Sequence, residues 1–179
     1  MLKKNNTGLI IIDVQGKLAH SVDESDTLIA NCAILVKGAL ALKLPIIWAE
    51  QIPEKLGTTV DEISSLLPDH QPIDKFTFSA CDEPRFLDAI KSAGVDSFLI
   101  CGIEAHICVY QTAAMLKEMG FNVEVVTDCV SSRAPENKSL AINKLNNLGV
   151  QSTGLEMCFY ELVKDSRSSE FKPILNLIK

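Results

Sequence analysis

The segment SFLICG at residues 97–102, followed by IEAHICVYQTAAMLKEMG at residues 103–120, decides the fold. The first six residues form a short apolar run that ends at Gly102, which is typical of a buried strand. The residues after it predict a helix from about Ile107 to Glu118, which Gly120 ends. A buried strand followed by a helix is the repeating unit of a parallel sheet covered by helices.

The same alternation recurs along the chain. Four further apolar runs predict strands, at residues 8–13, 46–49, 123–127 and 150–155. Helical patterns predict helices at residues 25–44, 84–93 and 138–148 and after Met157. In the first of these helices we expect one buried face, formed by Leu28, Cys32, Leu35, Val36, Ala39 and Leu40. Prolines and a glycine interrupt residues 51–80, where we expect loops around a short helix near residues 60–67.

Length and composition indicate one domain spanning residues 1–179. Hydrophobic residues make up 47% of the chain and charged residues 22%, as in ordinary globular proteins. The net charge of −6 and the lack of basic runs argue against nucleic acid or an anionic membrane as a partner. The apolar run near the N-terminus is too short for a signal peptide, and no run reaches the ~18 residues of a membrane span. We therefore expect a cytoplasmic protein.

Six cysteines are present, but their spacing predicts neither a disulfide framework nor a zinc site. We expect most of them to be buried, reduced and unreactive. Ligands of open α/β sheets bind beyond the carboxyl ends of the strands, so polar residues at those ends are candidates for chemistry. Asp13 closes the first strand, Lys75 follows the proline-rich stretch, and Cys108 opens the helix after Gly102.

A thiol at a helix N-terminus faces unpaired N–H groups, and a nearby ammonium would stabilise its thiolate further. We therefore expect Cys108 to carry negative charge near neutral pH. A carboxylate, a lysine and a cysteine together provide an acid–base group, an activator and a nucleophile. These three residues lie far apart in the sequence, so their spacing alone does not establish that they meet.

The motifs around these residues resemble those of the isochorismatase-like cysteine hydrolases, in order, from residue 8 to about residue 160. They are Ile12-Asp13-Val14-Gln15, Lys75-Phe76, the block from Gly102 to Ala113, and Val126-Thr127-Asp128-Cys129-Val130-Ser131-Ser132-Arg133. The Glu-Ala-His form of the block is similar to the small isochorismatase-domain hydrolases whose substrate is unassigned.

The resemblance implies a three-layer α/β/α sandwich with a six-stranded parallel sheet, in a homodimer or a larger homo-oligomer. It implies Asp13 as general base and acid, Lys75 as the charge beside the thiol, and Cys108 as the nucleophile. It also implies a cis peptide bond entering Glu104. The backbone N–H groups of Glu104 and Cys108 would then form the oxyanion hole.

The nicotinamidase branch of the family carries a metal site after its second strand, with an aspartate and histidines. Here the stretch is Trp48-Ala49-Glu50-Gln51-Ile52-Pro53, without a histidine. We therefore expect no metal and no cofactor. True isochorismatases cleave a vinyl ether without a thiol, so the cysteine favours a small amide-like C–N substrate and a thioester intermediate.

Two alternatives remain open: a vinyl-ether hydrolase of the isochorismatase type, and a binding or scaffold protein without turnover. A flavodoxin-like nucleotide binder is disfavoured, because no glycine-rich phosphate loop follows Asp13. Gln15 and Glu50 lie at strand ends and would either contact the substrate or brace loops. His106 would line the pocket or be structural, and Trp48 is expected in the core.

Overall fold

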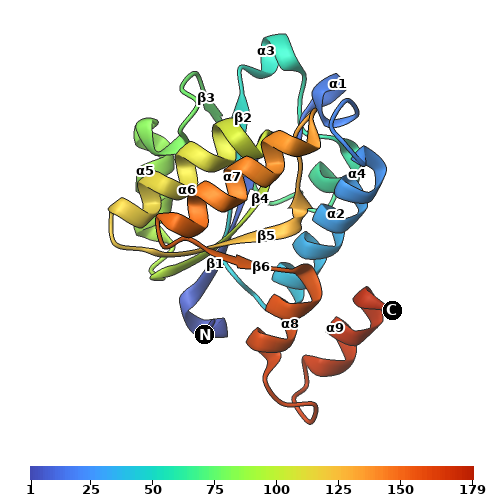
Figure 1. The fold of residues 1–179 in the computed structure, drawn as a ribbon. Helices are drawn as coiled ribbons and strands as arrows, with labels where there is room; N and C mark the ends of the chain where they lie inside the picture. Colours follow the sequence, from blue (N-terminus) through green and yellow to red (C-terminus); the bar gives the residue numbers. More distant parts are fainter.

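Six parallel strands form one sheet in the computed structural model, which describes all 179 residues (Figure 1). The strand order is β3-β2-β1-β4-β5-β6, and each neighbouring pair is parallel. The strands are β1 (Thr7–Ile12), β2 (Ile46–Gln51), β3 (Ile73–Lys75), β4 (Ser97–Gly102), β5 (Asn122–Val130) and β6 (Gln151–Thr153). The predicted fold class, a six-stranded parallel sheet in an α/β protein, is confirmed.

Helices cover both faces of the sheet, as Figure 1 shows. One layer contains α2 (Ser25–Ala41), α4 (Asp61–Ser64), α8 (Leu155–Val163) and α9 (Phe171–Ile178). The other contains α5 (Pro84–Ser92), α6 (Tyr110–Glu118) and α7 (Pro135–Asn147). Short helices complete the chain: α1 (Gly16–Ala19), α3 (Pro53–Leu56), and the turns η1 (Lys4–Asn6), η2 (Ala80–Asp82) and η3 (Ala105–Val109).

The central strand β1 has every residue buried, because it contacts both helical layers. Successive side chains of a strand point to opposite faces. Leu9 and Ile11 accordingly pack into the core under α2 and α8, whereas Ile10 and Ile12 pack into the core under α5 and α6. The continuous apolar run of the sequence thus reflects burial on two sides.

The strand order reverses between β1 and β4, which are neighbours in the sheet but not in the sequence. Crevices that bind ligands form at such a reversal, beyond the carboxyl ends of the strands. Gly102 ends β4 there with φ of +126°, and a Cβ at this position would lie 2.0 Å from the carbonyl oxygen of Ile12. Only glycine allows β1 and β4 to approach this closely at the crevice.

Two local predictions were wrong. Residues 73–75, expected in a loop, form the edge strand β3, whose three residues are too few to give a periodic signal. Leu40 is 38% exposed, because the buried face of α2 turns away from it in the last turn of the helix. The helix predicted from about Ile107 to Glu118 is present. It begins two residues earlier, as the π-helical turn η3, and is α-helical from Tyr110.

All six cysteines are buried and none forms a disulfide. Four of them belong to the core beneath α2 and α8, namely Cys32, Cys101, Cys129 and Cys158. Trp48 lies in the same core, as expected, and its indole N–H donates to Thr59 Oγ1 at 2.7 Å. None of the helices combines the length and the hydrophobicity that crossing a membrane requires.

Candidate active site

Asp13 follows the last residue of β1 and turns the chain away from the sheet. Its φ of +53° lies in the left-handed region, which aspartate tolerates better than most residues. Two backbone hydrogen bonds hold this turn: Asp13 N–H donates to Ala49 O at 3.1 Å, and Gln15 N–H donates to Asp13 O at 2.8 Å. The residue is 2% exposed and lines the crevice.

Lys75 is the last residue of β3, where the parallel register places it opposite Gln51 at the end of β2. Its side chain is fully buried, and Nζ lies 2.7 Å from Asp13 Oδ2. The ammonium also donates to Gln51 Oε1 at 2.6 Å and to the carbonyl oxygens of Thr77 and Phe78 at 3.2 and 3.4 Å. The edge strand therefore delivers the lysine to the carboxylate at the end of β1.

Gln51 is itself held in place from two sides. Its side-chain amide donates to Phe76 O at 3.0 Å. Its backbone N–H donates to Gln15 Oε1 at 2.6 Å, and Gln15 Nε2 donates back to Gln51 O at 3.2 Å. The second proton of the same Gln15 amide bonds Gly57 O at 2.7 Å. The two glutamines thus form a chain of amides that ends at the ammonium of Lys75.

Cys108 lies in η3, is 7% exposed, and lines the same cavity as Asp13. The other carboxylate oxygen, Asp13 Oδ1, is buried and has no hydrogen-bond partner, and the interaction with the nearby Cys108 thiol lowers the pKa of Asp13. Burial outweighs that interaction and the influence of Lys75, and raises the pKa of Asp13 above its ordinary value. The three predicted residues are therefore together in space.

The expectation of a thiolate at neutral pH is wrong for this arrangement. Burial raises the pKa of Cys108 to about 12, and the negative charge of Asp13 acts in the same direction. The charge of Lys75 acts in the opposite direction and is outweighed. Cys108 therefore rests as a neutral thiol next to a carboxylate, and its proton must be removed when it reacts.

The peptide bond between Ile103 and Glu104 is cis. The carbonyl oxygen of Glu104 accepts from the N–H groups of Ile107 and Val109, at 3.0 and 3.3 Å. Its own N–H group donates to no acceptor in the protein. The turn that carries Cys108 thus leaves a backbone donor free near the cavity.

A second charged group lies beside the cysteine. The carboxylate of Glu104 is 5% exposed and accepts a short hydrogen bond from Arg133 Nε. His106 Nδ1 lies 3.4 Å from Glu104 Oε2 and 3.0 Å from Ser132 Oγ. His106 therefore contacts a carboxylate and a hydroxyl, and it is not among the residues that line the cavity.

The cavity has a volume of about 220 Å³, below the ~300 Å³ at which ligand pockets usually begin. Its walls are Asp13, Leu18, Gln51, Leu56, Phe78, Ile103, Glu104, Ile107, Cys108 and Arg133. Neither Gln15 nor Glu50 lines it. Gln15 braces Gln51, and Glu50 Oε1 accepts from Thr59 N–H at 2.6 Å, so the hydrogen bonds of both favour bracing of loops.

Sequence reasoning missed Gln51 as the partner of Lys75, although its position at the end of β2 marks it as a residue of the crevice. It also missed the apolar wall formed by Leu18, Leu56 and Phe78, because these residues lie on short helices and loops without a periodic signal. No group of three or more His, Cys, Asp or Glu side chains has a geometry that could hold a metal ion.

The parallel sheet and the group of carboxylate, lysine and cysteine at its strand reversal define a class of α/β hydrolases. Residues 7–157 match the isochorismatase domain. The chain is 35% identical over 176 residues to the secreted isochorismatase effector Isc1 of Phytophthora sojae (strain P6497), which covers 96% of this chain and 83% of that protein. The chain belongs to the isochorismatase family of hydrolases.

Solved structures agree with this assignment. The MAR1 ribonuclease from Caenorhabditis elegans superposes with a TM-score of 0.93 at 35% identity, over 99% of this chain and 91% of that one. YcaC from Escherichia coli, described as an octameric hydrolase of unknown specificity, has a TM-score of 0.93 at 26% identity. The match covers 98% of this chain and 89% of that one. YcaC from Pseudomonas aeruginosa, solved with hexane-2,5-diol and covalent acrylamide, also has a TM-score of 0.93 at 26% identity. The match covers 98% of this chain and 90% of that one.

Proposed function

We propose that this protein is a metal-independent cysteine hydrolase that cleaves a small amide-like C–N bond through a thioester at Cys108. The observation that carries the proposal is the buried carboxylate of Asp13. One of its oxygens bonds Lys75 Nζ at 2.7 Å, and the other is buried without a hydrogen-bond partner in the protein, in the cavity that Cys108 also lines. A carboxylate held in this way is placed to take a proton from the sulfur.

The reaction proceeds in two halves. Asp13 takes the thiol proton while the sulfur of Cys108 attacks the carbonyl carbon, and the N–H groups of Glu104 and Cys108 hold the oxyanion. Asp13 then gives the proton to the leaving nitrogen, the C–N bond breaks, and a thioester remains. Asp13 next deprotonates a water molecule, which attacks the thioester. The acid leaves and the thiol regains its proton.

The raised pKa values of Asp13 and Cys108 support this division of labour. A thiol with a pKa near 12 is a weak nucleophile at neutral pH unless a base removes its proton during the attack. A carboxyl group whose pKa is raised is a better base than an ordinary carboxylate, and a usable acid for the leaving nitrogen. Lys75 stabilises whichever of the two groups carries the negative charge.

The decisive experiment is a panel of small amides, imides and ureides, assayed for ammonia or amine release by the wild type and by Cys108→Ala. We expect turnover that is lost in the variant, and an acyl adduct on Cys108 in the mass spectrum of the rapidly quenched wild type. Equal turnover by both forms would remove the thiol from the mechanism. Formation of a dihydroxy acid from isochorismate would instead favour the vinyl-ether alternative. Absence of turnover with every substrate would favour a binding or scaffold role.

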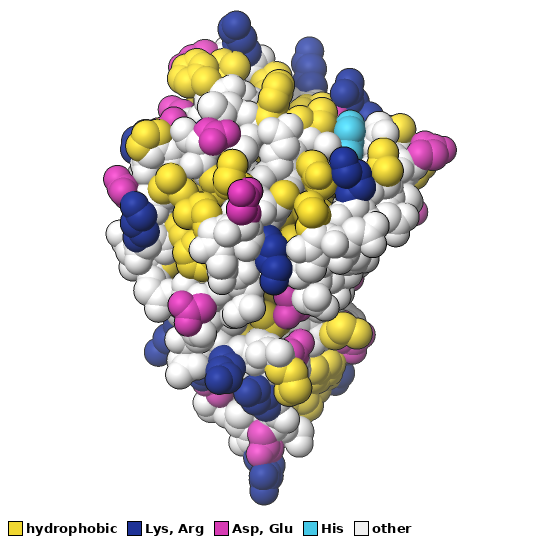
Figure 2. Space-filling model, turned by 60° about the vertical axis from the view of Figure 1, so that its left-hand side comes forward, with side chains coloured by type: hydrophobic (Ala, Val, Ile, Leu, Met, Phe, Trp, Pro, Cys, Tyr) yellow, Lys and Arg dark blue, Asp and Glu magenta, His cyan; other side chains and the backbone are white.

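Metal independence is supported by the side chains at the end of β2, where the Gln51 amide is occupied by Lys75 and Phe76 O. Metal analysis of active protein tests it. The name of the C. elegans relative suggests ribonuclease activity for that protein. Here the net charge is −6, and acidic and basic side chains are interspersed on the face in Figure 2, which does not favour a polyanion.

We infer one domain over residues 1–179 that assembles as a homodimer or larger homo-oligomer, in line with the octamer described for E. coli YcaC. Light scattering during size-exclusion chromatography gives the mass that tests this. A cytoplasmic location stays a prediction, because the P. sojae relative is called secreted. Cell fractionation would decide it.

A further inference from the structure

Arg133 is the one basic side chain in the wall of the cavity. It follows β5 by three residues, its side chain is 61% exposed, and its Nε donates to Glu104 Oε1. Its two terminal amino groups donate to no acceptor in the protein, and the proposed reaction gives them no role. The guanidinium of this wall residue thus keeps one edge without a partner in the protein.

Glu104 fixes the direction of this edge. Its carboxylate is almost fully buried and is held by both Arg133 and His106, so the Nε side of the guanidinium is anchored. A guanidinium is planar and rigid, and two parallel N–H groups on one edge match the two oxygens of a carboxylate. An anchored, half-exposed guanidinium with a free edge is therefore a preformed anion receptor.

Five of the ten residues in the wall have large apolar side chains. Leu18, Leu56 and Phe78 line the cavity, together with Ile103 and Ile107 from the segment that carries Cys108. Phe78 is 57% exposed although it lies at a pocket, which indicates that it is available to contact a ligand. A ligand that fills the cavity therefore packs against apolar side chains as well as the polar groups of the wall.

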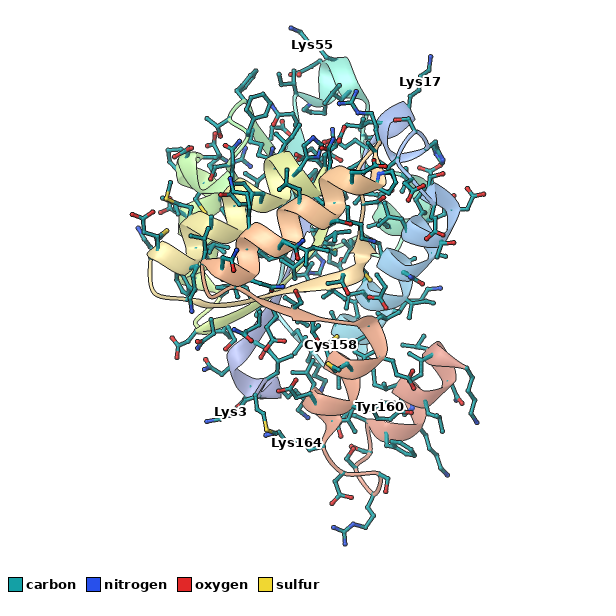
Figure 3. All side chains as sticks on the ribbon, in the orientation of Figure 1. Lys3, Lys17, Lys55, Cys158, Tyr160 and Lys164 are labelled. Carbon is teal, nitrogen blue, oxygen red and sulfur yellow. The ribbon has the colours of Figure 1, made fainter.

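Two lysines lie on the short helices that contribute to the wall. Lys17 and Lys55 neighbour Leu18 and Leu56 on α1 and α3, which pack against each other, and Figure 3 shows both lysines extending into solvent at that end of the molecule. Such charges attract an anion toward a cleft at long range. They lie at the opposite end from Cys158 and Tyr160 on α8 (Figure 3).

We propose that the substrate of Cys108 carries a carboxylate or an equivalent anionic group, which Arg133 binds, joined to the scissile amide by a short apolar segment. This inference rests on the proposed function, which it deepens by naming the substrate class. Arg133 acts on binding and specificity and takes no part in the proton transfers of Asp13.

Alkylation of Cys108 tests the inference without knowledge of the substrate. Iodoacetate and iodoacetamide have the same size and reactive carbon but differ in charge. With either reagent the sulfur bonds the CH₂ carbon, iodide leaves, and the thiol proton passes to Asp13. The ratio of the two rates, measured by mass spectrometry of the Cys108 peptide, therefore reports anion recognition at the cavity.

We expect this iodoacetate-to-iodoacetamide ratio to fall about tenfold in Arg133→Gln, the size of one charge-assisted hydrogen bond. The exposed Arg85 on α5 is the matched control, since Arg85→Gln changes the net charge equally and should leave the ratio at the wild-type value. An unchanged ratio in Arg133→Gln overturns the inference. Failure of both reagents to modify wild-type Cys108 overturns the proposed function, and the inference with it.

A double variant separates recognition from net charge. Arg133→Gln also leaves Glu104 without its cation, which alone would repel iodoacetate. In Glu104→Gln/Arg133→Gln both charges are gone and the local net charge equals that of the wild type. We expect the ratio to stay low in this variant. Recovery of the wild-type ratio would mean that net charge alone decides, and would overturn the proposed receptor.

Discussion

Replacement of Lys75 by methionine should destabilise the protein strongly, and more so at neutral than at acid pH. Methionine fills most of the volume of the lysine stem, so the change removes the charge and the donor rather than the packing. Nζ is fully buried and lies 2.7 Å from Asp13 Oδ2, whose side chain is 3% exposed. Removing one partner of such a buried pair costs about 3–5 kcal/mol, because an unpaired charge remains.

The pH dependence follows from Asp13. Burial already raises its folded-state pKa above the ordinary value of 3.8, and Lys75 opposes that rise. Without Lys75 the pKa rises further, so folded Asp13 holds its proton at pH values where unfolded Asp13 has lost it. Stability of the variant is then greatest below about pH 4, and falls as the pH rises through the folded-state value. The difference from the wild type should therefore widen toward pH 7.

Urea unfolding of the wild type and of Lys75→Met between pH 4 and pH 8 measures this difference. Lys91→Met, at an exposed position on α5, is the matched control and should change the unfolding free energy by less than about 0.5 kcal/mol. Asp13→Asn in the Lys75→Met background should remove the pH dependence. A loss in Lys75→Met below about 1 kcal/mol that does not vary with pH would refute the reasoning.

Three further predictions concern the site and the core. Cys108→Ser should leave the ultraviolet thiolate absorbance at pH 7 unchanged, because the pKa of Cys108 is about 12; loss of one thiolate signal would contradict the neutral resting thiol. Gln51→Leu removes the acceptor that lies 2.6 Å from Lys75 Nζ and should shift the pH profile of turnover, whereas Gln51→Glu should restore an acceptor. Identical pH profiles for the wild type and Gln51→Leu would speak against positioning of Lys75 by Gln51. Gly38→Ala should lower the free energy of unfolding by about 1–3 kcal/mol, since the new Cβ would lie 2.0 Å from the Phe159 ring. An unchanged melting temperature would contradict this prediction.

The sheet was predictable because its central strands carry local signals. β4 occupies the expected residues 97–102, and β1 differs from the expected run by one residue at each end. Both are buried on two faces, so their sequences are continuously apolar. The position of Asp13 beyond the carboxyl end of β1 follows directly from the same signal.

The surroundings of Lys75 were not predictable in this way. β3 has three residues, and its alternation of buried and exposed positions cannot be told from a loop over so short a length. What places Lys75 is the pairing with Gln51 on β2, a contact between residues distant in the sequence. The resting charge of Cys108 was wrongly predicted for a related reason, since burial and the charge of Asp13 are tertiary properties.

The ammonium of Lys75 has three hydrogens, and four oxygen atoms of the protein lie within 3.4 Å of it. No hydrogen remains to be shared with a guest molecule. In the proposed reaction Lys75 therefore acts through its fixed charge, while its hydrogens stay bonded to the protein. Compounds built to reach this lysine directly would have to break its ties to the protein first.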